Sequence, residues 1–257
     1  MLVILPPSET KRPPPDIGPV LQLGELTFPA LSEMRSRVLD ALIATSQLPD
    51  AKRRLLVGPS LVGEVQRNVR LRELPARPAI DTYAGPLYGG INPASWAPEV
   101  QARAGRQVVI VSALWGALRP ADRIPPYRLH VCSRLVGMDR LEPAWRTVLP
   151  AVLTEATGFA GPVLDLRSRA YQAVGRPAGL DDQTVTLRVR RSSHGGAHIG
   201  DVIAKRIRGE AASHVLSSAN QPEDPLDLAD LLATGWPIDI EPPAGTTRSW
   251  TITLEAP

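Results

Sequence analysis

The sequence predicts an α/β protein in which helices surround a mixed central β-sheet. Two apolar runs, residues 107–111 and 162–166, have the length and composition of strands that are buried on both faces. A third run, Leu2 to Leu5, opens the chain. Elsewhere apolar residues recur every three or four positions, which is typical of the buried face of a helix.

The elements follow from these patterns in chain order. Apolar residues between Leu31 and Ile43 share one helical face, with Thr27 as the expected cap and Pro29 in the expected first turn. The other expected elements are a helix from Ser60, a loop with short helical turns over 75–98, a helix over 145–153 bent at Pro150, a strand over 184–189, a helix over 199–207 and a strand over 250–254.

The chain of 257 residues is expected to form one domain, 1–257, because it has no repeat or long linker and is near the upper size of a single core. The segment 210–257 is expected to belong to that domain, and we expect a monomer. No run of about 18 apolar residues is present, so we expect no membrane span. The single Cys132 fits a reducing cytoplasm and excludes an internal disulfide; beside Val131 it is expected in the core.

Charge is unevenly distributed along the chain. Residues 210–257 contain eight acids and one base, whereas residues 1–209 contain 28 bases and 18 acids. The basic body is expected either to attract a phosphate-bearing partner or to be neutralised by the acidic segment within the fold.

A polar segment, Ser112 to Leu129, directly follows a predicted buried strand, where α/β sheets commonly bind ligands. It holds a hydroxyl, a phenol, a carboxylate and three guanidinium groups among three prolines. Arg119 and Arg128 are candidates for clamping an anion. Asp122 is expected either to accept a proton or to orient an arginine. The structural alternative is that arginine and aspartate pair to fix a long loop. Trp115 is the tryptophan suited to stacking on a base.

Two further polar stretches follow predicted strands. Ser8, Glu9 and Lys11 come after the first strand, and Ser168 and Tyr171 come after the strand at 162–166. If the centre of the sheet is parallel, the carboxyl ends of these strands lie at one edge. We therefore expect all three polar segments to meet there.

The same residues carry a resemblance to a known family. Leu-Pro-Pro-Ser-Glu-Thr-Lys at the N-terminus, the Ser112-to-Leu129 segment, and Leu-x-Ser-x-x-Tyr ending at Tyr171 resemble three signatures of the YaaA family of peroxide stress proteins. Weaker similarity continues through Tyr83-Ala-Gly, through Gly200 with Lys205 and Arg206, and through Gly235-Trp236. The resemblance implies a central sheet ringed by helices with a helix-hairpin-helix-like element, a cytoplasmic location, DNA binding and limitation of iron-dependent oxidative damage.

One stretch departs from that family. Many members have a basic cluster where this chain has Ser193 to Gly200, although Arg190, Arg191, Lys205 and Arg206 still flank it as expected DNA contacts. Loss of basic side chains weakens phosphate binding and makes a small-molecule ligand more credible. His194 and His198 have the spacing of a zinc helix, but no Glu follows His194 and two glycines oppose helix, so we expect no metal and no cofactor.

These features define competing hypotheses. The first is a DNA-binding protein of the peroxide stress response. The second is an enzyme, of lyase or hydrolase type, acting on a nucleobase, nucleotide or similar small anion. The third is a protein that interacts through its acidic segment.

In the enzyme, Asp122 or Glu9 is the base. The proton donor is Tyr127, Tyr171 or Lys11, Arg119 binds the anionic or carbonyl end, and Tyr88 shares the stacking role with Trp115. The expected substrate- or anion-binding residues are Ser8, Glu9, Ser112, Trp115, Arg128, Ser168 and Tyr83.

Overall fold

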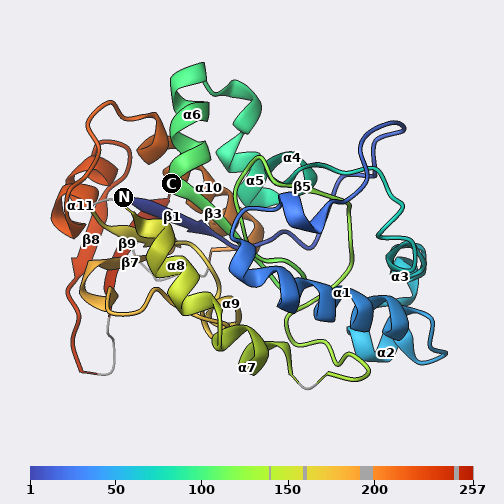
Figure 1. The fold of residues 1–257 in the computed structure, drawn as a ribbon. Coiled ribbons are helices and arrows are strands. Elements are labelled where there is room, and N and C mark those ends of the chain that lie inside the picture. The colour runs from blue at the N-terminus through green and yellow to red at the C-terminus, as the bar shows by residue number, and fades with distance from the viewer. Residues whose placement is uncertain (139, 159–160, 192–198, 246–248, 257) are drawn as a thin grey trace.

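The computed structural model describes residues 1–138, 140–158, 161–191, 199–245 and 249–256. Within these residues, seven strands form one sheet in the order β4-β3-β1-β6-β7-β9-β8 (Figure 1). The strands of this sheet are β1 (Leu2–Leu5), β3 (Val108–Ser112), β4 (Gly116–Leu118), β6 (Val163–Asp165), β7 (Thr184–Arg191), β8 (Ile238–Glu241) and β9 (Trp250–Ala256). A second, small sheet pairs β2 (Arg77–Pro78) with β5 (Arg123–Ile124).

The centre of the large sheet is parallel and its two edge strands are antiparallel. Strand β1 pairs in parallel with β3 and β6, and the parallel order continues through β7 to β9. Strands β4 and β8 run antiparallel to β3 and β9. This arrangement confirms the predicted mixed sheet. Strands β8 and β9, which come from the acidic segment, are part of the same sheet as β1.

Helices cover the sheet, with α8 in front of the strands and α10 behind them in Figure 1. The α-helices of the described residues are α1 (Ser32–Ser46), α2 (Ala51–Leu55), α3 (Val62–Asn68), α4 (Ala79–Thr82), α5 (Pro86–Ile91), α6 (Pro98–Gln107), α7 (Leu141–Arg146), α8 (Leu149–Thr157), α9 (Arg169–Gln172), α10 (Asp201–Ser217) and α11 (Pro225–Ala233). Among the described residues, no helix combines the length and apolar character needed to cross a membrane.

Two expected helix details are wrong. The helix expected to bend at Pro150 is two helices, because Pro150 lies in the first turn of α8 instead of inside one helix. Thr27 does not cap α1, which begins at Ser32 after a short 3₁₀ turn. The backbone N–H and hydroxyl of Thr27 instead donate to the carboxylate of Asp122.

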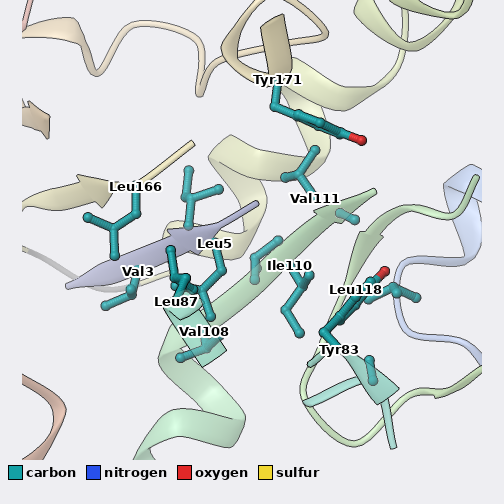
Figure 2. Close-up of a cluster of buried hydrophobic side chains, with 14 of the residues drawn as sticks. Val3, Leu5, Tyr83, Leu87, Val108, Ile110, Val111, Leu118, Leu166 and Tyr171 are labelled. Carbon is teal, nitrogen blue, oxygen red and sulfur yellow. The ribbon is translucent and has the colours of Figure 1, made fainter. Parts of the chain in front are cut away.

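The core lies against β1, β3 and β6, whose residues are all buried. Figure 2 shows aliphatic side chains of these strands packing with Leu87 of α5 and with the rings of Tyr83 and Tyr171. Arg35 is also fully buried, and its guanidinium donates to the backbone carbonyls of Trp115 and Ala117 and so holds the turn between β3 and β4. The apolar residues around Arg35 in the sequence do not indicate that this arginine is buried.

Helices α5 and α10 cross at two glycines. A Cβ on Gly209 would lie 2.0 Å from the carbonyl oxygen of Leu87, and one on Gly90 would lie 2.1 Å from that of Arg206. Both neighbours are backbone atoms and cannot move without displacing a helix. Substitution of either glycine therefore changes the spacing of the two helices.

We expect Gly209→Ala to lower the free energy of unfolding by about 1–3 kcal/mol, the usual cost of overpacking a close contact. The matched control is Gly89→Ala on α5, where no atom lies within 4 Å of the added Cβ. That change is expected to be neutral or to stabilise by about 0.5–1 kcal/mol. Urea unfolding followed by circular dichroism measures both, and equal stability of the two variants would contradict the close crossing.

Candidate active site

A cavity of about 400 Å³ opens at the carboxyl ends of β1 and β6. The chain leaves β1 toward β3 on one side and returns to β6 on the other, so the cavity lies at the point where the strand order reverses. Open α/β sheets usually bind ligands at such a point. The cavity is lined by Pro6 to Thr10, Gly85 to Tyr88, His130, Leu166, Ser168, Tyr171, Val202, Lys205 and Arg208. Ser8, Glu9, Ser168 and Tyr171, from two of the expected segments, thus line one cavity.

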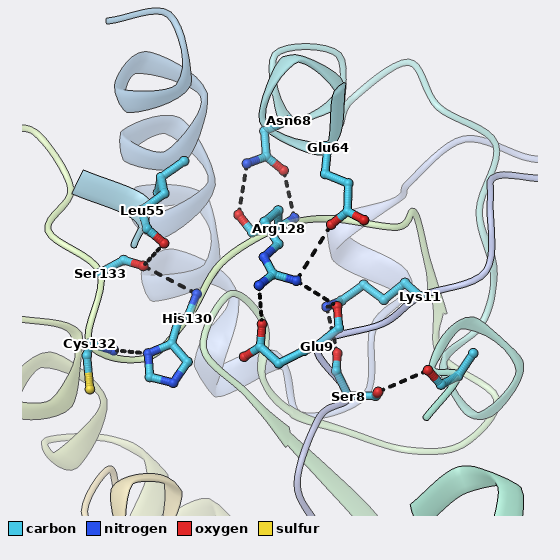
Figure 3. A network of polar contacts seen from close by, with 11 residues as sticks. Ser8, Glu9, Lys11, Leu55, Glu64, Asn68, Arg128, His130, Cys132 and Ser133 are labelled. Atoms are coloured by element: carbon cyan, nitrogen blue, oxygen red, sulfur yellow. Dashed lines mark hydrogen bonds and ion pairs between the residues drawn. The ribbon is translucent and has the colours of Figure 1, made fainter. Parts of the chain in front are cut away.

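The carboxylate of Glu9 is positioned by Arg128 (Figure 3). Arg128 Nη2 lies 2.8 Å from Glu9 Oε2, and Arg128 Nη1 lies 3.7 Å from Glu64 Oε2. The side chain of Asn68 fixes the backbone of Arg128 by accepting from its N–H at 2.8 Å and donating to its carbonyl at 2.9 Å. Arg128 is therefore held at both its backbone and its guanidinium, so it presents Glu9 in a defined orientation.

Tyr171 also lines this cavity. Its ring is buried, and burial together with the negative charge of Glu9 raises the pKa of the phenol well above its ordinary value. The phenol therefore retains its proton at neutral pH and can donate it. Glu9 and Tyr171 form a carboxylate and a proton donor on one cavity.

His130 is a lining residue that the sequence analysis did not select. Its Nδ1 accepts the backbone N–H of Cys132 at 3.1 Å, so in the neutral imidazole the proton lies on Nε2. The ring meets Tyr171 edge-on, with centroids 6.4 Å apart. The feature of the sequence that could have identified His130 as a site residue is its position directly after the Ser112-to-Leu129 segment. Cys132 itself is exposed, so its expected place in the core is wrong.

Lys11 lies next to the lining residues Ser8 and Glu9 but does not itself line the cavity. Its ammonium donates to the carbonyl of Ser8 at 2.7 Å and to that of Glu9 at 3.4 Å, and it lies 4.3 Å from the centre of the Tyr127 ring. Burial lowers the pKa of Lys11 to about 7; the charge of Glu9 opposes this shift and that of Arg128 adds to it. The amine is therefore partly neutral at physiological pH.

A chain of three hydroxyl groups, those of Ser112, Tyr127 and Tyr83, lies next to Lys11. Ser112 Oγ accepts the backbone N–H groups of Leu114 and Trp115, which leaves its proton for Tyr127 Oη at 2.7 Å. Tyr127 Oη in turn lies 3.0 Å from Tyr83 Oη. Burial raises the pKa of Tyr83 to about 12 and that of Tyr127 well above its ordinary value. These neutral, buried residues thus pack next to Lys11.

The chain has three lysines, so the lowered pKa of Lys11 can be measured directly. In competitive acetylation read by mass spectrometry, the reactivity of Lys11 is expected to rise as the pH passes about 7, since the neutral amine is the nucleophile. The internal controls are Lys52 and Lys205, which are both exposed. A titration of Lys11 that coincides with that of Lys52 would disprove the shift.

The structure does not bring Arg119 and Asp122 to the cavity. Asp122 Oδ2 accepts the backbone N–H of Arg119 at 2.9 Å, and its Oδ1 accepts from Thr27. The guanidinium of Arg119 donates to the carbonyls of Arg106 and Val108 at 2.6 and 3.1 Å. Both side chains therefore fix the loop to its surroundings, as the structural alternative expected. They do not pair with each other through their side chains, because Asp122 contacts the backbone N–H of Arg119.

Trp115 is also unavailable to a ligand. Its side chain is completely buried and meets the Tyr127 ring edge-on, with centroids 6.0 Å apart. The expected stacking of a base on Trp115 is therefore wrong, because no face of the indole reaches a cavity. Tyr88, the other stacking candidate, lines the cavity and donates its hydroxyl to the carbonyl of Pro6 at 2.8 Å.

Most of the expected DNA contacts are in ion pairs. Arg190 pairs with Glu255 and Asp239, and Arg188, which lies on the same strand, pairs with Glu241. On α10, Lys205 pairs with Asp201 and Arg206 pairs with Glu210. Arg191 is exposed at the end of β7. Much of the basic surface is thus paired with acids, several of them from the acidic segment.

His194 and His198 lie outside the described residues. Among the residues that are described, no group of three His, Cys, Asp or Glu side chains is placed to hold a metal ion.

The fold and the site are those of an α/β protein with a cavity at the point where the strand order of a mostly parallel sheet reverses. The family model described as peroxide stress protein YaaA matches residues 1–241. The chain is 37% identical over 256 residues to the UPF0246 protein SCO2297 of Streptomyces coelicolor, which covers 98% of this chain and 97% of that protein. It is 33% identical over 256 residues to the UPF0246 protein CE1889 of Corynebacterium efficiens, with 99% of each covered. The chain belongs to the YaaA family of peroxide stress proteins.

Proposed function

We propose that this protein is an enzyme that transfers protons on a small, planar, anionic metabolite, such as a nucleobase or nucleotide, bound in the cavity at β1 and β6. The observation that carries the proposal is that Glu9 and Tyr171 line one cavity, in which burial raises the pKa of the Tyr171 phenol. Acid and base partners of an active site commonly have environments that separate their pKa values in this way.

In this proposal Glu9 is the general base and Tyr171 the general acid. The carboxylate of Glu9, oriented by Arg128, takes a proton from an N–H or C–H group of the substrate. Tyr171 gives its proton to the carbonyl oxygen or leaving group of the substrate, and both groups are reset by a return of the proton after product release. Arg208 supplies positive charge for the anion, and Tyr88 supplies an aromatic surface. With loss of the leaving group these steps are an elimination of lyase type; in a hydrolase Glu9 instead takes a proton from a water molecule, whose oxygen bonds to the substrate as the leaving group departs with the proton of Tyr171.

A ligand screen with a blocked variant tests the proposal. Thermal shift against a panel of nucleobases, nucleosides, nucleotides and aromatic carboxylates identifies stabilising compounds, and proton NMR then detects turnover. Ser168→Trp places a bulky side chain at the cavity rim, where Ser168 is exposed, and is expected to abolish the stabilisation. Ser60→Trp, at an exposed position outside the cavity, is the control. A panel that stabilises neither protein, or both equally, counts against the proposal.

A second proposal is the DNA-protecting role in the cytoplasm that the resemblance implies, with limitation of iron-dependent damage. It is supported by the family description and by the position of Lys205 and Arg206 on the exposed side of α10. Because these residues already have acidic partners, we rank it below the enzyme. Duplex DNA binding that falls steeply with salt and weakens in Arg206→Gln supports it. Absence of binding at low salt removes it.

A further inference from the structure

A second cavity of about 680 Å³ adjoins the first. It extends over the polar residues that follow β6 and over part of β7 and β9. Leu166, Ser168 and Arg208 line both cavities, so a ligand in one has direct access to the other. The two hollows therefore form a continuous site around the end of β6.

The second cavity is strongly basic. Its described lining has five arginines, at positions 167, 169, 176, 188 and 208, against one acid, Asp165. Asp165 is already neutralised, because Arg167 Nη2 lies 2.8 Å from its Oδ2 and both side chains are buried. Hydroxyl groups of Ser249 and Thr251 lie on the same wall. Arg167 is neutralised by the same pair and Arg188 pairs with Glu241, which leaves Arg169, Arg176 and Arg208 without an acidic partner among the described residues. An anion in the cavity would be attracted by these charges.

Arg208 lines both cavities, and one of its hydrogen-bond donors has no partner among the described residues. Its Nε is buried and has no hydrogen-bond partner among the described residues. A buried N–H without a partner costs free energy, and a ligand that accepts its hydrogen bond removes that cost. Arg169 and Arg176 approach from α9 and the loop after it.

We propose that the substrate is a phosphorylated metabolite whose planar part occupies the cavity of Glu9 and Tyr171 and whose phosphate binds Arg169, Arg176 and Arg208 in the adjoining cavity. This inference rests on the proposed function and deepens it by naming the substrate class. Guanidinium groups suit the role because they bind phosphate oxygens in pairs. The arginine cavity thereby determines specificity for the phosphorylated form.

Inorganic pyrophosphate is the probe for the arginine cavity. Isothermal titration calorimetry of the full chain at low salt is expected to give one site. Arg208→Gln and Arg169→Gln are each expected to weaken the dissociation constant about tenfold or more, as loss of a charge-assisted hydrogen bond does. Arg169 is exposed, so its variant tests the proposal even if Arg208→Gln fails to fold. Arg53→Gln, at an arginine that is 81% exposed on α2, is the matched charge control.

Competition then links the anion to the substrate. Phosphorylated members of the metabolite panel are expected to displace pyrophosphate, whereas their unphosphorylated forms are not. No pyrophosphate binding, equal effects of Arg208→Gln and Arg53→Gln, or displacement by duplex DNA alone would each overturn the inference. Failure of the acid–base proposal looks different: Glu9→Gln then retains full turnover while pyrophosphate still binds to the arginines.

Discussion

Arg167→Met is expected to lower the free energy of unfolding by about 3–5 kcal/mol, the usual effect of removing one partner from a buried ion pair. Arg167 Nε and Nη2 each lie 2.8 Å from an oxygen of Asp165, and both side chains are at most 1% exposed. Nη1 donates to the carbonyls of Tyr171 and Gly175. The substitution leaves the Asp165 charge buried and unpaired, and it releases the segment that carries Tyr171.

Urea unfolding measures this effect, with Arg169→Met as the matched control. Arg169 is exposed two residues further along the chain, and its substitution is expected to change stability by less than about 0.5 kcal/mol. The double variant Asp165→Leu/Arg167→Met is expected to recover part of the loss, because it removes the unpaired charge. A loss below about 1 kcal/mol for Arg167→Met would show that the pair is not buried as described.

The second large effect concerns turnover of a substrate found in the metabolite screen. Glu9→Gln and Tyr171→Phe are each expected to lower kcat by about 10²–10⁴, the range attributed to one general acid or base. Both substitutions preserve shape and remove one proton-transfer group, so binding is expected to change by only a few fold. Steady-state kinetics and calorimetry on the same variants separate the two effects.

Glu64→Gln is the control for Glu9→Gln. Glu64 also faces Arg128, at 3.7 Å, but it does not line the cavity. Its substitution is expected to lower kcat by less than tenfold. If Glu64→Gln and Glu9→Gln were equally impaired, the role of Glu9 would be electrostatic, through Arg128, and the assignment of a general base would fail.

The central strands could be predicted because burial on both faces requires continuous apolar runs. Strands β1 and β6 lie within the expected ranges, β3 ends one residue beyond its expected range, and their parallel pairing is confirmed. Strand β4 was missed because Gly116 to Leu118 reads as part of a polar segment. Strand β8 was missed although Ile238 and Ile240 alternate with acids, which is the usual pattern of a half-buried edge strand.

The site could be predicted only where a polar segment directly follows a parallel strand. Glu9 and Tyr171 satisfy that condition after β1 and β6. Arg119 does not, because antiparallel β4 carries the chain back along β3, and Arg119 contacts the carbonyl of Val108 at the start of that strand. Arginine and aspartate serve equally to bind ligands and to fix loops, so residue type alone could not separate the two roles.

The most direct test of the proposed function is a crystal structure of the protein with the tightest compound from the metabolite screen. We expect its planar part within hydrogen-bond distance of both the Glu9 carboxylate and the Tyr171 hydroxyl, between the ends of β1 and β6. A compound bound elsewhere, with no contact to Glu9 or Tyr171, would contradict the proposed active site.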